Sequence, residues 1–205
     1  MSSLMALNNM LYNRHNLAVA KFAAKDGIRE EINAVLFAKE KTAATDGIRL
    51  LEVSVSTTGK AEEFPQIDGI SAMRGCSPFL VNAKQVAELK PKGAKHLPIT
   101  EFVALKHLDD KRVEFLTTDL ESSRVSQARR IDGKFPDYEQ IFPKDEPKVR
   151  FKIDGAKLAE LLKVMSELPQ SGQVEVLCYG GLLPIELRSD NGNQKARGLI
   201  MPIRE

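Results

Sequence analysis

Tryptophan is absent from the chain, cysteine occurs only twice, and the net charge is only +2. Cys76 and Cys178 have no paired spacing, which favours small buried apolar residues in a reducing compartment over a disulfide. The three histidines, His15, His96 and His107, have no ligand spacing with either cysteine, so we expect no metal site. The near-neutral total does not by itself indicate a nucleic-acid binder, so any basic surface has to come from the distribution of charges.

Long apolar runs are also missing. No run approaches the ~20 residues that a membrane-spanning helix needs. Residues 1–15 lack the basic start and continuous apolar core of a signal peptide. Hydrophobic residues make up 42% of the chain and charged residues 28%, which is ordinary for a soluble globular protein. We therefore expect a cytoplasmic protein with no membrane segment. The length of 205 residues suffices for one large domain or two small ones.

The last part of the chain predicts a strand, a helix and three more strands. Residues 148–153 alternate in polarity, and Asp154 is a natural N-cap for the following helix. The apolar face of that helix carries Leu158, Leu161, Leu162 and Met165. The three later strands are expected at 173–178, 182–189 and 196–203, separated by glycine-containing turns.

The same order occurs twice more. In the middle part, Asn82 caps a short helix between a strand at 78–81 and three strands at 100–107, 111–118 and 123–130. In the first part, Asn16 is expected to cap a helix at 17–25, followed by strands at 32–39, 41–45 and 48–56. Its opening strand has only 4–11 as a candidate. The pairs Thr45-Asp46, Thr118-Asp119 and Ser189-Asp190 stand at matching points of the three units.

These observations predict an α+β fold of three β-α-β-β-β units, with chance similarity among α+β segments as the alternative. Between the second and third units lies RRIDGKFPDYEQIFPKDEP (129–147), which has the prolines and charges of a linker. Phe135, Tyr138, Ile141 and Phe142 nevertheless give it more apolar bulk than a solvated linker needs.

Three motifs resemble the bacterial DNA polymerase III β sliding clamp. AATDGIRLLEVSV (43–55) is similar to a strand-turn-strand pattern of that family, and RRIDGKFPDYEQIFP (129–143) to the connector between its second and third domains. GLIMPIRE (198–205) is similar to the strand with which clamps finish. Each motif alone is weak, but all three occur in family order on the predicted repeat.

The resemblance implies the DNA-clamp fold over about one and a half domains. Residues 1–143 would form a complete clamp-like domain resembling the family's second domain. Residues 144–205 would form a half-domain resembling the end of its third domain. Phe135, Tyr138 and Phe142 would then be buried against the flanking domains, and Pro136 and Ile141 would line a pocket.

The resemblance also implies a processivity factor that encircles or cradles duplex DNA and docks polymerase-type peptides, with a clamp loader as a further candidate partner. The expected DNA-facing residues are lysines and an arginine that lie on or near the predicted helices. Side chains of this type contact the phosphates of DNA independently of its sequence. They are Lys21, Lys25, Arg29, Lys84, Lys90, Lys92, Lys157 and Lys163. Acidic residues lie among them, so an ordinary solvated face is the alternative.

The expected partner-peptide pocket is apolar, with one arginine to orient the peptide. Its residues are Thr45, Gly47, Arg49, Leu50, Pro136, Ile141, Leu199, Met201, Pro202 and Ile203. The alternative for the last strand is plain core packing.

Nothing in the sequence assembles a nucleophile, a base and an orienting group, and no glycine-rich phosphate loop occurs. The recurring aspartates are expected to be turn residues. We therefore expect no enzyme and no cofactor, leaving a small α+β enzyme as the disfavoured function. The other alternative is a peptide-binding module that forms no ring and sequesters clamp partners. An unmatched third unit predicts a homodimer through its helix face, and a tetrameric ring could follow.

Overall fold

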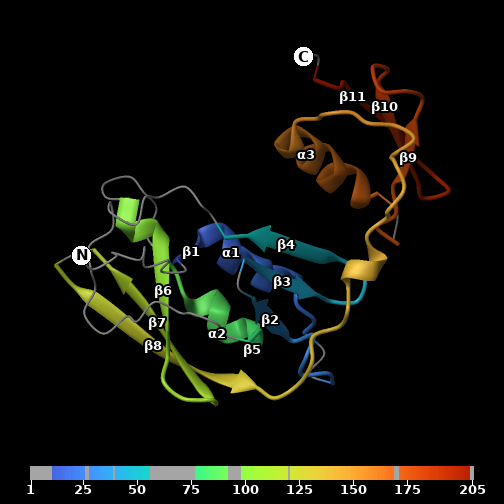
Figure 1. The fold of residues 1–205 in the computed structure, drawn as a ribbon. Helices are drawn as coiled ribbons and strands as arrows, with labels where there is room; N and C mark the ends of the chain where they lie inside the picture. Colours follow the sequence, from blue (N-terminus) through green and yellow to red (C-terminus); the bar gives the residue numbers. More distant parts are fainter. Residues whose placement is uncertain are drawn as a thin grey trace. The chain divides into compact units, whose positions relative to one another are not determined.

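The computed structural model describes residues 11–25, 28–38, 40–55, 77–91, 98–119, 121–168 and 171–203. The chain divides into two compact bodies, Met1–Glu139 and Gln140–Glu205, which we call the N-terminal and C-terminal bodies (Figure 1).

The first repeat of the N-terminal body begins with a short strand that leads directly into a helix. β1 (Leu11–Asn13) is followed by α1 (Arg14–Ala18) and the 3-10 helix η1 (Val19–Phe22). Asn13 caps α1, because its side chain accepts from the backbone of His15 and Asn16. The expectation that Asn16 is the cap is therefore wrong. The Asn16 side chain instead accepts from the backbone N–H of Asn13, which completes a capping box. β2 (Ala34–Phe37), β3 (Lys41–Thr45) and β4 (Leu50–Ser54) complete the repeat.

The second repeat follows the predicted order closely. β5 (Phe79–Asn82) leads into α2 (Ala83–Glu88), and the Asn82 side chain accepts from the backbone of Lys84, which confirms the predicted cap. The 3-10 helix η3 (Pro98–Glu101) precedes β6 (Phe102–His107), β7 (Arg112–Thr118) and β8 (Ser123–Ile131).

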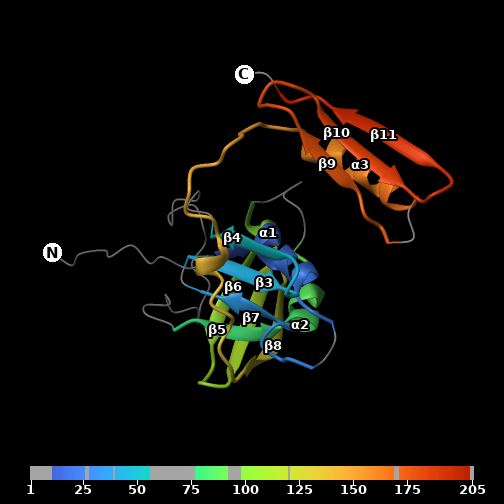
Figure 2. The ribbon, with the colours of Figure 1, turned by 90° about the vertical axis from the view of Figure 1, so that its right-hand side faces the viewer.

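The two repeats exchange their opening strands. The eight strands form one antiparallel sheet in the order β1-β6-β7-β8-β5-β2-β3-β4. β1 of the first repeat therefore pairs with β6 of the second, and β5 of the second pairs with β2 of the first. α1 contacts α2, and both cover one face of the curled sheet (Figure 2).

A continuous apolar core fills the space between the helices and the sheet. Tyr12 from β1 meets Phe37 from β2 edge to face, with ring centroids 5.1 Å apart, and Phe79 stacks on Phe37 at 5.4 Å. Phe115 of β7 joins them from the second repeat. Because all four belong to one cluster, neither repeat of this body has a core of its own.

The connector packs on the opposite face of the sheet. Phe135 and Tyr138 are buried in a second cluster with Ala34, Ala43 and Leu80, so the expected burial of these two aromatics is confirmed. Phe142 is 49% exposed, and the same expectation is wrong for it. The physical difference is that Phe135 and Tyr138 lie over β2 and β3, whereas Phe142 follows the 3-10 turn η4 (Glu139–Ile141).

Polar contacts fix the end of the buried part of the connector. The Tyr138 hydroxyl donates to Glu52 (2.6 Å), and the Lys41 ammonium lies 2.9 Å from the same carboxylate and also contacts Glu139. Burial, followed by the hydrogen bond to Glu52, raises the pKa of Tyr138 to about 12. Tyr138 therefore stays protonated and can donate at neutral pH.

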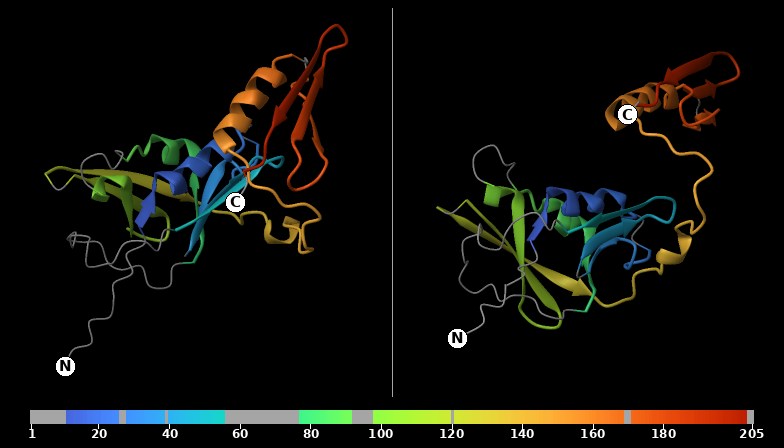
Figure 3. Two further views of the ribbon diagram at one scale, coloured as in Figure 1. Left: turned by 90° about the horizontal axis from the view of Figure 1, so that it is seen from above. Right: turned by 45° about the horizontal axis from the view of Figure 1, so that its top comes forward.

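The C-terminal body holds the third repeat. α3 (Gly155–Ser166) is capped by Asp154 as predicted, and it lies along a three-stranded sheet of β9 (Glu175–Cys178), β10 (Ile185–Asp190) and β11 (Lys195–Ile200) (Figure 3). The sheet order is β11-β10-β9. Cys178 is an exposed free thiol, so its expected burial is wrong, and Cys76 lies outside the described residues.

The predicted opening strand of the third repeat does not form. Residues 148–153 carry no strand, although their alternation is that of a strand. In the N-terminal body an opening strand pairs with the first sheet strand of the other repeat, as β5 does with β2. The described part of the C-terminal body contains one repeat, so within it this segment has no such strand to pair with.

The hairpin turns correct the alignment of the third repeat by one residue. Asp46 accepts from the backbone N–H groups of Ile48 and Arg49, at 2.9 and 2.7 Å. In the third repeat Asn191, not Asp190, accepts in this way, from Asn193 and Gln194. Asparagine serves this turn as well as aspartate does, so the expected equivalence of Asp190 is wrong.

Replacing Phe135 by Ala should destabilise the N-terminal body by about 3–5 kcal/mol, because it removes a buried ring from the connector cluster. Phe142→Ala is the matched control and should cost much less, since that ring is half-exposed. Urea unfolding followed by circular dichroism measures both. Equal losses for the two variants would contradict the assigned packing.

Candidate functional site

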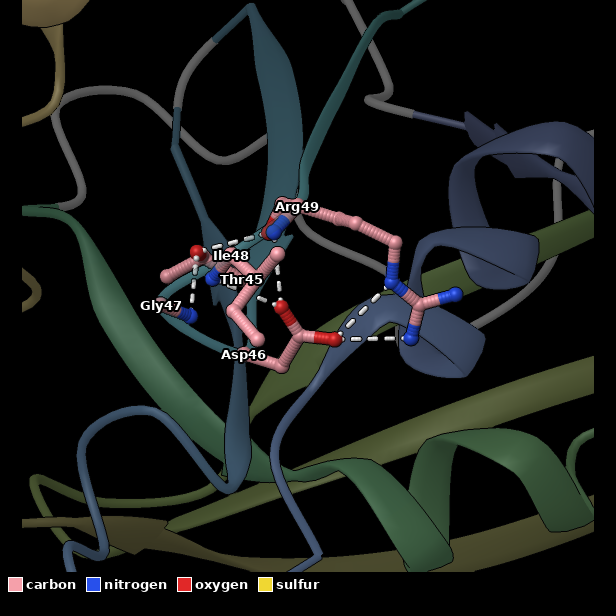
Figure 4. A network of polar contacts seen from close by, with 5 residues as sticks. All are labelled: Thr45, Asp46, Gly47, Ile48 and Arg49. Atoms are coloured by element: carbon pink, nitrogen blue, oxygen red, sulfur yellow. Dashed lines mark hydrogen bonds and ion pairs between the residues drawn. The ribbon is translucent and has the colours of Figure 1, made fainter. Parts of the chain in front are cut away.

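The first part of the predicted peptide pocket is the turn between β3 and β4 (Figure 4). The Thr45 hydroxyl donates to the Arg49 carbonyl (2.8 Å) and accepts from the Gly47 N–H (3.1 Å). Gly47 has a φ of 89°, a left-handed value that glycine adopts at little cost. The Thr-Asp-Gly sequence therefore closes a four-residue turn of defined shape.

Asp46 holds the arginine of this turn. Its second carboxylate oxygen accepts from Arg49 Nε (2.9 Å) and Nη2 (2.7 Å), a two-pronged contact. The backbone N–H of Arg49, then its side chain, lower the pKa of Asp46 to about 2. Arg49 also lies over the Phe22 ring, with its guanidinium carbon 5.3 Å from the centroid. The guanidinium is exposed to solvent but held on two sides.

Leu50 links the turn to the connector. It packs against the cluster that contains Phe135 and Tyr138. Pro136 lies between these two aromatics in the chain and is exposed, as is Ile48 in the turn. The structure thus brings the turn and the connector proline to the same part of the N-terminal body. Ile141, 75% exposed, belongs to the C-terminal body.

The last predicted strand lines a groove in the C-terminal body. This groove, about 790 Å³ in volume, lies between α3 and the end of β11. Leu199, Met201 and Ile203 line it and are all more than half exposed, whereas Pro202 is buried. The alternative of plain core packing therefore does not hold for Met201 and Ile203.

Sequence reasoning missed the helix wall of this groove. Leu161 and Val164 of α3 line it opposite the strand residues, and Asp154, Lys157 and Glu160 add charge at its rim. The i, i+3 spacing of Leu161 and Val164 was the available signal. Leu161 was instead predicted to face another unit, and it also packs close to Gly198 of β11.

The predicted pocket is thus divided between the two bodies. Thr45, Gly47, Arg49, Leu50 and Pro136 lie in the N-terminal body. Ile141, Leu199, Met201, Pro202 and Ile203 lie in the C-terminal body. Their meeting in one pocket stays a prediction.

The predicted DNA-facing residues are exposed wherever the structure describes them. Lys21 lies in η1, Lys84 in α2, and Lys157 and Lys163 in α3, while Lys25, Arg29 and Lys90 follow the helices. Lys92 lies outside the described residues. In the N-terminal body the guanidinium of Arg29 comes within 3.9 Å of the place that a Cβ on Gly47 would occupy, so Arg29 lies beside the β3–β4 turn. The role of the predicted DNA-facing residues stays a prediction.

The structure is similar to solved bacterial DNA polymerase III β subunits. It matches the sliding clamp of Pseudomonas aeruginosa bound to griselimycin with a TM-score of 0.67 and 19% identity, over 98% of this chain and 51% of that chain. It matches the β subunit of Borrelia burgdorferi with a TM-score of 0.64 and 18% identity, over 96% of this chain and 47% of that one. The chain has the fold of part of a β sliding clamp.

A third clamp, the β subunit of Streptococcus pyogenes, gives a TM-score of 0.63 at 11% identity, over 100% of this chain and 52% of that one. The chain therefore spans about half the length of the clamps it matches. The sequence matches no protein-family model and no curated protein.

Within the described ranges, no three His, Cys, Asp or Glu side chains are grouped so as to hold a metal ion. No helix in the described part of the chain is long and apolar enough to cross a membrane.

Asp46 should titrate near pH 2 in the folded protein, well below its ordinary 3.8. Because the folded-state pKa is depressed, the stability that this carboxylate contributes is present above about pH 4 and is lost as the pH falls toward 2. Arg49→Met should raise the pKa only part of the way, since the backbone N–H groups still donate. Carboxyl-carbon NMR measures both values. An Asp46 that titrates at 3.8 in the unaltered protein would contradict the described turn.

Proposed function

We propose that this chain is a clamp-like processivity factor that holds duplex DNA and docks polymerase-type peptide motifs. The observation that carries the proposal is the similarity to β sliding clamps along nearly the whole chain. In finer terms, the first two repeats correspond to a complete clamp domain and the third to half of another.

The DNA-binding part of the proposal rests on the helical faces. α1 and α2 lie together on one face of the N-terminal body, and exposed Lys21, Lys25, Lys84 and Lys90 lie on or next to the helical segments of that face. Lys157 and Lys163 are exposed on α3. Lysine contacts to phosphates are independent of base sequence and weaken steeply with salt. Such binding suits a protein that moves along duplex DNA.

The peptide-binding part of the proposal rests on two partial sites, one that offers a charged group and one that offers apolar side chains. The β3–β4 turn offers a fixed guanidinium at Arg49, and the groove between α3 and β11 offers exposed Leu199, Met201 and Ile203. Burying two large apolar side chains of a peptide would contribute ~3–5 kcal/mol before ordering costs. That magnitude suits an exchangeable partner.

A second function, a peptide-binding module that forms no ring, is favoured by one observation. The connector leads directly from the second repeat into the third. The third is the one repeat in the described part of the C-terminal body. A protein of this kind would compete for clamp partners without holding DNA. Retention on nicked circular DNA, with release after linearisation, separates the functions: a ring-forming clamp is retained on the circle, and the module is retained on neither.

Duplex binding should weaken strongly with salt, and changing Lys84, Lys90, Lys157 and Lys163 together to Ala should flatten the dependence. Each phosphate contact that is lost should reduce the slope of log K against log salt by about 0.9. The control changes four exposed lysines away from the helices, Lys111, Lys134, Lys144 and Lys195. Fluorescence anisotropy over a salt series gives the slopes. If the two quadruple variants have equal slopes, the helices do not face DNA.

A peptide of the Gln-Leu-x-Leu-Phe type should bind with an affinity that depends on both partial sites. Met201→Lys should reduce affinity at least about tenfold, because it places a charge against apolar peptide side chains. Deleting residues 201–205 or changing Leu50 to Lys should abolish binding. Leu182→Lys, at an exposed apolar residue outside the groove, is the control. Calorimetric titration showing full affinity for Met201→Lys and the deletion would reject the pocket.

A further inference from the structure

In the N-terminal body the opening strand β5 has a neighbouring strand on each side. β5 pairs on one side with β8, the last strand of its own repeat, through Leu80↔Ile131. On its other side it pairs with β2 of the other repeat, through Val81↔Val35 and Phe79↔Phe37. β1 pairs in the same way with β6, through Tyr12↔Val103. A complete pair of repeats therefore contains two crossed pairings of this kind.

Among the described residues, the third repeat makes a contact of the first kind and lacks a pairing of the second kind. Counting back from the N-caps, Lys152 stands where Leu80 stands, and counting from the hairpin turns, Ile203 stands where Ile131 stands. The Ile203 N–H donates to the Lys152 carbonyl at 2.7 Å, which reproduces the contact between the opening strand and its own last strand. Lys152 thus already lies beside Ile203, just after β11, as Leu80 of β5 lies beside Ile131.

The first sheet strand of the third repeat, β9, also has only one of its two expected neighbours among the described strands. The pairing of β9 with β10 makes Val176 equivalent to Phe37 and Leu105, which are 1% and 2% exposed. Val176 is 54% exposed. In the described part of the chain β9 has no strand on its outer side, whereas β2 and β6 each pair there with an opening strand. An exposed apolar strand edge of this kind is prone to pair with another strand.

We propose that two copies of this chain complete the third repeat by exchanging residues 151–153 across their β9 edges. The register follows from the two exchanged pairs of the N-terminal body. Phe151 of one copy lies opposite Val176 of the other, Lys152 opposite Glu175, and Ile153 opposite residue 174, which is also valine. Each two-fold related pairing then buries two apolar pairs on the helix side and places a lysine against a glutamate on the other.

The complementarity points to a second copy as the occupant. The segment that fits the β9 edge in length, polarity and charge belongs to the same repeat, and a two-fold axis satisfies both edges at once. The segment cannot fold back onto its own β9, because β10 and β11 lie between them. Three strand spacings of ~4.8 Å separate the two by roughly 14 Å. The inference does not depend on the proposed function.

Disulfide cross-linking tests the register directly. In a background with Cys76 and Cys178 changed to Ser, the variant with Lys152→Cys and Glu175→Cys should form a covalent dimer in mild oxidant. A link within one chain is excluded, since a disulfide needs Cα atoms within ~7 Å. The single variants, and Lys152→Cys combined with Lys195→Cys, are controls that should stay monomeric on a non-reducing gel. A double variant that remains monomeric overturns the proposal.

Charge reversal tests the same contact without cysteine. Sedimentation equilibrium should show a dimer for the unaltered chain at tens of micromolar. Lys152→Glu and Glu175→Lys should each weaken dimerisation about tenfold, because each places like charges opposite in two symmetric pairs. The doubly reversed variant should regain the original affinity. A monomeric unaltered chain, or a double variant no stronger than the single ones, overturns the exchange.

Discussion

The pairing of opening strands across repeats is the constraint on which this fold depends. A sheet edge exposes backbone donors and acceptors that need partners, and an apolar edge also needs cover. In the N-terminal body each repeat supplies the strand that the other lacks, so that Phe37 and Phe115 from different repeats meet in one core. A single repeat has neither a closed edge nor a closed core, which explains why the C-terminal body leaves Val176 exposed.

The turn and connector proposed to dock peptides are built on positions that this core holds in place. The β3–β4 turn projects from two strands of the eight-stranded sheet, and its arginine is fixed by Asp46 and by the Phe22 ring of η1. The connector is anchored on the other face through Phe135 and through Tyr138, whose hydroxyl contacts Glu52 of β4. Turn and connector therefore share one rigid support, which the proposed docking role would require.

Much of this architecture was predictable from local signals. Alternation and caps located α2 and α3 and the sheet strands, because Asn82 and Asp154 act on their own backbone. The Thr-Asp-Gly-x-Arg turn was predictable for the same reason. What failed depends on distant partners. Residues 148–153 have the pattern of a strand, but the described part of their own body holds no first sheet strand of a second repeat for them to pair with, and Phe142 is 49% exposed despite its apolar ring. The helix wall of the groove, Leu161 and Val164, was missed because a helical face does not reveal what it packs against.

The most direct measurement of the central constraint is backbone hydrogen exchange of residues 151–153 and 174–178 as a function of chain concentration. If opening strands must be supplied by another repeat, these amides exchange rapidly in dilute solution and become protected as the concentration rises, while those of β2 and β5 stay protected throughout. Protection of 151–153 and 174–178 that does not change with concentration would contradict the account.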